Sequence, residues 1–158
     1  MNLQEELKAL KQRIAELEGL AKDEQGFPQN GDNYWYINPL GIVLRDEWLD
    51  FVSERYMIEI GNVFKTEQDA HFAVEKLKVE AELRKFSRPF IEGEDNWYMA
   101  LGDAFETYYM NDSIDPIQGV IYFDSLKRAH QATGEIGAER IKKYIFEVEG
   151  TNHETSSY

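Results

Sequence analysis

The chain has 158 residues and a formal net charge of −13, and 42% of its residues are hydrophobic. This hydrophobic share predicts a packed fold, and the absence of cysteine excludes disulfides, cysteine nucleophiles and thiolate metal sites. No apolar run approaches the roughly 20 residues of a membrane span, and the acidic N-terminal segment is unlike a secretion signal. We therefore expect a cytoplasmic protein that does not enter the membrane.

Residues 1–24 carry the heptad pattern of a coiled-coil helix. Apolar residues recur at alternating spacings of four and three, at the a and d positions: Leu3, Leu7, Leu10, Ile14, Leu17 and Ala21. In a parallel pair of such helices Glu6 faces Lys11, and Arg13 faces Glu18, so that both pairs attract. The pattern predicts a helix that forms a homodimer. The alternative is an amphipathic helix lying on its own domain, because three heptads are short for a lone coiled coil.

Two blocks of the remaining sequence occur twice. The stretch GDNYWYI at 31–37 corresponds to GEDNWYM at 93–99, and NVFKTEQDAHFA at 62–73 corresponds to IYFDSLKRAHQA at 121–132. Internal similarity of this kind indicates a duplicated unit. Each copy is expected to contain strands followed by a helix.

The duplication predicts the organisation of the chain. One copy of about 60 residues buries only a marginal core, so two copies that share one sheet make a better domain. We predict an α+β fold in which a duplicated strand–strand–helix unit forms an antiparallel sheet with helices on one face. The predicted segments are a coiled-coil helix at 1–24, a hinge at 25–30, the first unit at 31–90, the second unit at 91–149 and a disordered tail at 150–158.

The predicted strands are rich in β-branched and aromatic residues and are bounded by glycine, asparagine, aspartate or proline. They are YWYI, GIVL, YMIEIGNVF, WYMAL and GVIYF. The helices begin after Thr66 and Ser125, whose side-chain oxygens can accept hydrogen bonds from first-turn amides. The first helix is expected at 66–86. The second is expected to be shorter and to be followed by a terminal helix or strand, because Gly134 and Gly137 interrupt its apolar pattern.

Aromatic residues occupy equivalent positions in the two copies. Trp35 corresponds to Trp97, and Phe64 corresponds to Phe123, so we expect these four rings to superpose and to be largely buried. The alternative for the tryptophans, with their tyrosine neighbours, is a platform on which a nucleotide base stacks.

The excess of acidic residues is concentrated in two segments. Residues 93–118 hold six acidic and no basic residues, and residues 25–60 hold six acidic and two basic ones. Such a surface disfavours contact with nucleic-acid phosphates and favours a basic protein partner; the alternative is ordinary solubility charge. The predicted partner-binding residues are Glu94, Asp95, Asp103, Glu106, Asp112 and Asp115, with Asp46, Glu47 and Asp50 as secondary contacts.

No motif in the sequence supports catalysis, a cofactor or a metal. The chain lacks the GxGxxG, P-loop, HExxH and EF-hand patterns. His71 and His130 occupy equivalent positions in the two copies, which favours a packing or surface role over a catalytic one. We therefore expect a protein that is not an enzyme and uses no cofactor.

The heptad helix, GDNYWYINPLG and GNVFKTEQDAHFAVEKLKVEAELRKF together resemble small accessory proteins of phages and prophages of Gram-positive bacteria. The resemblance covers most of residues 3–86 and implies no catalytic residues. It implies action in a bacterial host, where acidic anti-CRISPR proteins present carboxylates to a basic nucleic-acid groove. The expected function is inhibition of a host defence nuclease by nucleic-acid mimicry; the alternatives are a nucleotide-sequestering sponge and a structural or regulatory virion-associated protein.

Overall fold

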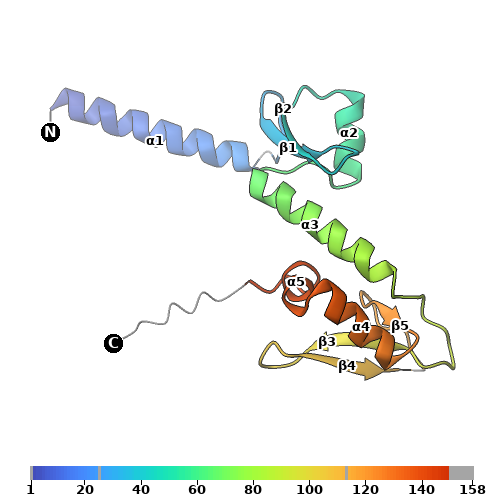
Figure 1. Cartoon of the computed structure of the whole chain (residues 1–158). Coiled ribbons are helices and arrows are strands. Elements are labelled where there is room, and N and C mark those ends of the chain that lie inside the picture. The colour runs from blue at the N-terminus through green and yellow to red at the C-terminus, as the bar shows by residue number, and fades with distance from the viewer. Residues whose placement is uncertain (1, 25, 113, 150–158) are drawn as a thin grey trace. The chain divides into compact units, whose positions relative to one another are not determined.

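The structure, a computed structural model, describes residues 2–24, 26–112 and 114–149. Residue 25 of the predicted hinge and the predicted tail at 150–158 lie outside the described residues. Within the described part of the chain the fold is α+β, with five helices and five strands (Figure 1). None of these described helices combines the length and the apolar character that crossing a membrane requires.

The chain divides into two compact units, residues 1–71 and 72–158. Each unit contains its own small antiparallel sheet, one with two strands and one with three. The prediction of one shared sheet is therefore wrong. The physical reason is the pairing of the first hairpin strand in each unit. One edge of that strand pairs with the second hairpin strand, and its other edge pairs with a short segment of the same unit, so neither edge is left to join the other unit's sheet.

Helix α1 spans Leu3–Glu24. The Asn2 side chain accepts a hydrogen bond from the Gln4 amide at 3.0 Å, and the Glu5 carboxylate accepts one from the Asn2 amide at 3.2 Å. These reciprocal contacts resemble a capping box and fix the helix start. The described side chains of α1 are exposed, including the seam residues from Leu3 to Leu17. The side chain of Ala21, the last seam residue, lies outside the described part.

Unit 1 contains the hairpin formed by β1 (Asn33–Ile37) and β2 (Val43–Glu47). A third segment runs along the other edge of β1. Trp35 and Phe64 exchange backbone hydrogen bonds of 2.9 and 2.8 Å, and the Asn62 side chain bonds both backbone groups of the last β1 residue at 2.8 Å. β1 is therefore the central strand of unit 1.

Helix α2 spans Val52–Glu59, where the strand YMIEIGNVF was predicted to begin. That prediction is wrong for residues 56–59 because both ends of the helix are fixed by local hydrogen bonds. At the start, the Glu54 carboxylate accepts from the Phe51 amide at 2.7 Å. At the end, the amides of Gly61 and Asn62 donate to carbonyls of the last turn at 2.9 and 2.8 Å, and Gly61 has a φ of 71°. This arrangement is a Schellman motif, which stops a helix.

Helix α3 spans Glu67–Arg84, close to the predicted range of 66–86. The Thr66 hydroxyl accepts from the Asp69 amide at 3.1 Å, as the sequence predicts for a cap. The first residues of α3 belong to unit 1, while its buried Val79 and Leu83 belong to the core of unit 2.

The sheet of unit 2 has the strand order β4–β3–β5. β3 (Trp97–Leu101) coincides with the predicted WYMAL, and β5 (Tyr122–Phe123) is the end of the predicted GVIYF. β4 (Thr107–Asn111) was not among the predicted strands. Beyond β5, Arg88 pairs with Tyr122 and closes that edge of the sheet.

The two units repeat several local contacts. Trp97 pairs with Phe123 in unit 2 as Trp35 pairs with Phe64 in unit 1. The Ser125 hydroxyl accepts from a first-turn amide of the following helix at 3.2 Å, as Thr66 does in unit 1. Of the four equivalent rings only Phe123 is buried, whereas the other three are half-buried. Phe123 confirms the prediction of burial, and the other three rings are partly covered.

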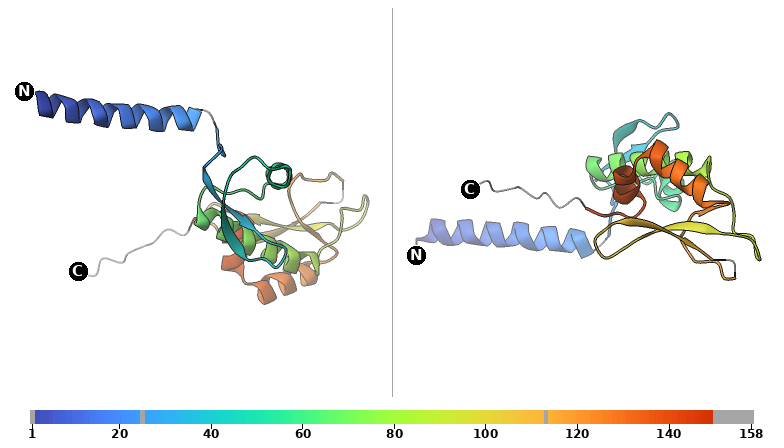
Figure 2. Two further views of the ribbon diagram at one scale, coloured as in Figure 1. Left: turned by 90° about the horizontal axis from the view of Figure 1, so that it is seen from above. Right: turned by 60° about the horizontal axis from the view of Figure 1, so that its bottom comes forward.

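Two helices complete unit 2. α4 (Leu126–Ile136) and α5 (Ala138–Tyr144) are separated at Gly137, whose φ of 98° favours glycine. The prediction of a shorter second helix is confirmed, and of the two predicted alternatives for the segment after it, a helix or a strand, the structure has the helix. α4 packs against β3 and β5 and lies on one face of the sheet (Figure 2). The buried core of unit 2 consists of Val79, Leu83, Met99, Phe123, Ala129, Ala132, Ile136 and Ile141.

Candidate functional site

A buried asparagine organises one end of the unit 2 sheet. The Asn96 side chain is fully buried; it donates to the carbonyls of Ile91 and Glu94 at 2.8 and 2.9 Å and accepts from the Ile91 amide at 3.0 Å. Its backbone amide donates to the Asn111 side chain at 2.8 Å. Because these bonds satisfy a group that is costly to bury alone, they fix the loop that presents the neighbouring carboxylates.

Four predicted residues gather at this end of the sheet, which we call the acidic end: Glu94, Asp95, Asp112 and Asp115. Asp95 accepts from the Asn111 side chain at 2.7 Å. Asp112 accepts from the amides of Ile114 and Asp115 at 2.9 and 3.3 Å, and its own amide donates to the Asn96 carbonyl at 3.1 Å. Glu94, Asp95 and Asp115 are exposed, and Asp112 is half-buried.

One cation lies against the acidic end. The Arg88 guanidinium donates to the Asp95 carbonyl at 2.6 Å and to the Asn96 side chain at 2.8 Å, and it lies 3.6 Å from the Glu94 carboxylate. The sequence of residues 93–118 has no basic residue, but the fold brings one from outside that segment. Part of the charge of Glu94 is therefore balanced within the protein.

The other two residues of the predicted primary group lie elsewhere. Asp103 and Glu106, which we call the turn pair, are in the tight connection between β3 and β4 and are both exposed. β3 is five residues long, so the turn pair is about 13 Å or more from the acidic end along the sheet. The six residues thus form two groups at opposite ends of one hairpin.

The secondary residues Asp46, Glu47 and Asp50 belong to unit 1 and are exposed. Asp50 forms a two-point ion pair with Arg55, with distances of 2.9 and 2.6 Å. These hydrogen bonds hold the pKa of the Asp50 carboxyl below its usual range. Asp50 is therefore a less available contact for a basic partner than Asp46 or Glu47.

Unit 1 contains a buried polar pair that the sequence analysis missed. Glu54 is 4% exposed, and its carboxylate accepts from the Tyr34 hydroxyl at 3.3 Å and from the amides of Leu49 and Phe51 at 3.1 and 2.7 Å. The two amides precede α2 and the hydroxyl comes from β1, so Glu54 has a structural role that ties the start of α2 to β1. A glutamate two residues into a helix, after the stretch DFVS, was the available sequence signal.

The Tyr34 phenol gives unit 1 a pH dependence. Burial, followed by the Glu54 carboxylate, raises the pKa of Tyr34 from 10.0 to about 12. The folded protein holds this proton more tightly than the unfolded chain does. The stabilisation of the folded state by the protonated Tyr34 is therefore present below pH 10 and is lost as the pH rises towards 12.

We expect the free energy of unfolding to fall across this range, and to fall less in Tyr34→Phe, as measured by urea denaturation at a series of pH values. Equal declines in the two proteins would contradict this assignment. Burial and Asp112 also raise the pKa of Tyr98, which leaves a residual decline in the variant.

The remaining candidate groups form no reactive cluster. His71 is exposed 3.5 Å from Glu67, and the exposed His130 packs its ring on Tyr109 with 4.3 Å between centroids. Trp97 packs against the unit 2 core, which leaves it poorly placed as a stacking platform. In the described ranges, no three acidic, histidine or cysteine side chains are placed to hold a metal ion.

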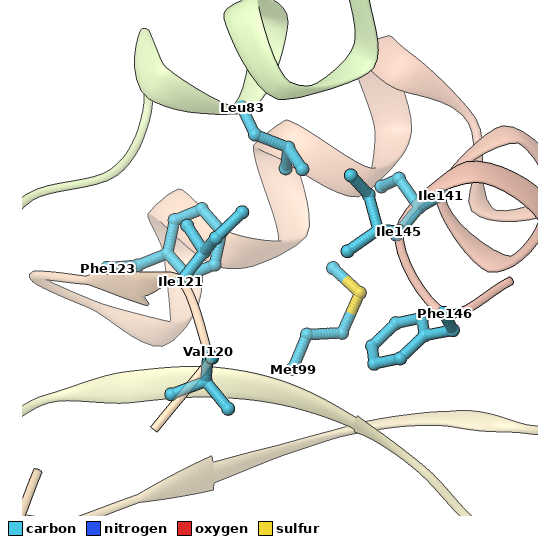
Figure 3. A pocket seen from close by; sticks show the side chains of 9 residues that line it. Leu83, Met99, Val120, Ile121, Phe123, Ile141, Ile145 and Phe146 are labelled. Carbon is cyan, nitrogen blue, oxygen red and sulfur yellow. The ribbon is translucent and has the colours of Figure 1, made fainter. Parts of the chain in front are cut away.

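One cavity of unit 2 is small and apolar. It has a volume of about 40 Å³ and is lined by side chains that include Leu83, Met99, Ile145 and Phe146. In Figure 3, Met99 reaches into it from β3 and Leu83 from α3. Pockets for organic ligands usually measure about 300–1,000 Å³, so this space is a packing gap within the core.

Larger open hollows are lined by charged side chains. One of about 450 Å³ contains Phe105, Lys142 and Lys143, and there Lys142 is already paired with Glu139 at 3.0 Å. Such a hollow has no concentrated charge of one sign. The geometry therefore offers exposed surfaces for a macromolecular partner more readily than an enclosed ligand site.

Comparison of the chain with protein-family models, with curated proteins and with solved structures found no match.

Proposed function

We propose that this protein is a non-catalytic, dimeric inhibitor that presents carboxylates to the basic groove of a nucleic-acid-handling protein, in the manner of an anti-CRISPR protein. The observation that carries the proposal is the acidic end of unit 2. The buried Asn96 bonds the backbone of the loop that carries Glu94 and Asp95, and Asp112 accepts from the Asp115 amide. The exposed carboxylates of Glu94, Asp95 and Asp115 therefore require little ordering when a partner binds. The phage resemblance of the sequence and action in a bacterial cytoplasm are part of this proposal.

The dimer is supported by the exposure of the α1 seam. The side chains of Leu3, Leu7, Leu10, Ile14 and Leu17 are 50–81% exposed. A row of large aliphatic side chains in water favours association, and the heptad spacing fits a coiled coil. In a parallel dimer the charges at the g and e positions attract, whereas a centred antiparallel pair would bring Lys11 against Lys11 and Arg13 against Arg13. Charge therefore favours the parallel arrangement.

Local contacts that recur in both units support a binding surface made of two similar units in one chain. The paired Trp–Phe contacts and the hydroxyl caps at Thr66 and Ser125 occur at corresponding places in both units. In a parallel dimer these units are doubled again. A basic partner would then meet several acidic hairpins, and long-range attraction would raise its association rate.

A structural or assembly role is a second candidate, and the exposed seam of α1 favours it independently of the carboxylates. A nucleotide-sequestering role has less support. Tyr34 and Tyr98 are buried and Trp97 packs on the core, so these rings present little free face for stacking.

The proposed inhibition predicts a specific effect of charge reversal. Changing Glu94, Asp95 and Asp115 together to lysine is expected to weaken inhibition by on the order of a hundredfold, because attractive contacts across the groove become repulsive. The thermal unfolding midpoint should change little, since exposed charges contribute little to stability. The measurement is cleavage of DNA by a panel of purified restriction and RNA-guided nucleases at increasing inhibitor concentration and at two salt concentrations.

The turn pair supplies a matched control in the same hairpin. Asp103→Lys with Glu106→Lys alters charge at the opposite end of the sheet and should weaken inhibition less than the triple variant. Inhibition should also decline as salt rises. The proposal fails if no nuclease of the panel is inhibited, or if the triple variant inhibits as strongly as the unchanged protein.

A further inference from the structure

We propose that the outer edge of β4 binds an extended basic segment of the partner protein as an additional strand. This inference rests on the proposed function and specifies the shape and charge of the partner segment. β4 is an edge strand of the unit 2 sheet, and in the described residues no strand pairs with its outer side. The opposite edge of the sheet, at β5, is closed by Arg88.

The register shows which backbone groups of β4 point outward. Asp112 donates its amide proton to the Asn96 carbonyl at 3.1 Å, and Gly102 donates to the Glu106 carbonyl at 2.9 Å. Facing residues in an antiparallel ladder alternate between bonded and non-bonded pairs. Thr107, Tyr109 and Asn111 therefore direct their amide and carbonyl groups away from β3. They supply donors and acceptors at the spacing that an added strand requires.

Strands β2 and β4 differ in the protection of their outer edges. β2 carries Arg45, Asp46 and Glu47, and charged side chains on an edge oppose unwanted strand pairing. β4 has the sequence TYYMN, which contains no charged residue, proline or glycine. Tyr108 and Met110 are 44% and 42% exposed, so alternate side chains of an added strand would meet apolar surface there.

Carboxylates lie at both ends of the open edge. Glu106 immediately precedes β4, and Asp112, with Asp115 nearby, immediately follows it. Residues 106 and 112 are about 20 Å apart along an extended chain. A partner segment with an apolar centre and lysine or arginine about six residues apart would match this pattern.

The same charges disfavour a second copy of this protein as the occupant. In antiparallel pairing of two β4 edges centred on Tyr109, Glu106 of one chain would face Asp112 of the other. Like charges directly opposite each other in a sheet are destabilising.

One further group on β4 lacks a partner in the described residues, since the Thr107 hydroxyl oxygen is buried without a hydrogen bond.

The test uses the full chain and a synthetic peptide of alternating valine and threonine with lysine at both ends. A second peptide has glutamate in place of lysine, and a third keeps the lysines but carries N-methyl groups on alternate backbone amides. We expect binding by the first peptide alone, measured by titration calorimetry. Hydrogen exchange should slow at the amides of Thr107, Tyr109 and Asn111 when it binds, and should not slow at Arg45 or Glu47 on the β2 edge.

A backbone substitution gives an independent readout. Thr107→Pro removes one outward amide without touching the ladder to β3, and should weaken peptide binding by about tenfold. Arg45→Pro makes the equivalent change on the β2 edge and should have no effect. Circular dichroism checks that both variants keep their fold.

Each outcome decides between the inference and its rivals. Absence of peptide binding, binding that survives N-methylation, or unchanged exchange at the β4 amides overturns the added strand. If the triple charge reversal abolishes nuclease inhibition while Thr107→Pro leaves inhibition intact, this inference fails and the proposed function stands. If no nuclease is inhibited but the lysine peptide binds the edge, the proposed function fails and strand binding stands.

Discussion

Replacing Leu10 and Leu17 with glutamate should convert the protein from a dimer of twice 18.5 kDa to a monomer of 18.5 kDa. Both leucines are at d positions and are at least half exposed in the single chain, so a dimer is what buries them. Each buried leucine contributes about 1.5–3 kcal/mol, and a glutamate placed in the seam replaces this gain with charge repulsion. Light scattering after size-exclusion chromatography at micromolar concentration measures the mass directly.

The control places the same charge on the outer face of α1. Gln12→Glu with Ala15→Glu adds two negative charges at the f and b positions and should leave the dimer intact. Because the chain has no cysteine, Leu3→Cys also reports the orientation. A parallel dimer should form one disulfide between equivalent residues on oxidation. A monomeric unchanged protein would contradict the coiled-coil proposal at once.

Replacing Phe123 with alanine should lower the free energy of unfolding by about 3–5 kcal/mol. Phe123 is 1% exposed and is the β5 residue in the buried core of unit 2, so its removal leaves a cavity. Small domains are stable by only about 5–15 kcal/mol, so this loss is a large fraction of the total. Urea denaturation followed by tryptophan fluorescence measures it.

The equivalent position in unit 1 supplies the comparison. Phe64 makes the same backbone pairing to a tryptophan but is half-buried, so Phe64→Ala should cost less, about 1–2 kcal/mol. Equal losses for the two variants would show that the two phenylalanines are packed alike and would contradict the difference in burial described above.

Local sequence signals predicted many of the elements. The hydroxyl caps at Thr66 and Ser125, the heptad spacing and the aromatic strand WYMAL each depend on neighbouring residues, and each corresponds to an observed element. α2 was missed because its apolar residues resemble a strand, while its ends depend on Glu54 and Gly61. β4 was missed although Gly102 and Asp103 precede TYYMN and Asp112 follows it, and the ladder to β3 decides its conformation.

The candidate site was harder to predict because its arrangement depends on distant parts of the chain. Composition indicated that residues 93–118 are acidic, but the hairpin divides their carboxylates between its two ends. Arg88, which lies before the acidic segment, comes to lie against Glu94 through the pairing of its backbone with Tyr122. The pairing of strands, which sequence periodicity does not specify, determines both results.

The placement of α3 has a consequence for the order in which the chain can fold during synthesis. The cap of this helix is made early, at Thr66, but its buried Val79 and Leu83 pack with side chains as late as Ile141. When the ribosome has synthesised only the first 90 residues, these two side chains have no cover. The second half of the chain must therefore emerge before the helix can complete its packing, and a fragment that begins at residue 91 would lack two side chains of its own core.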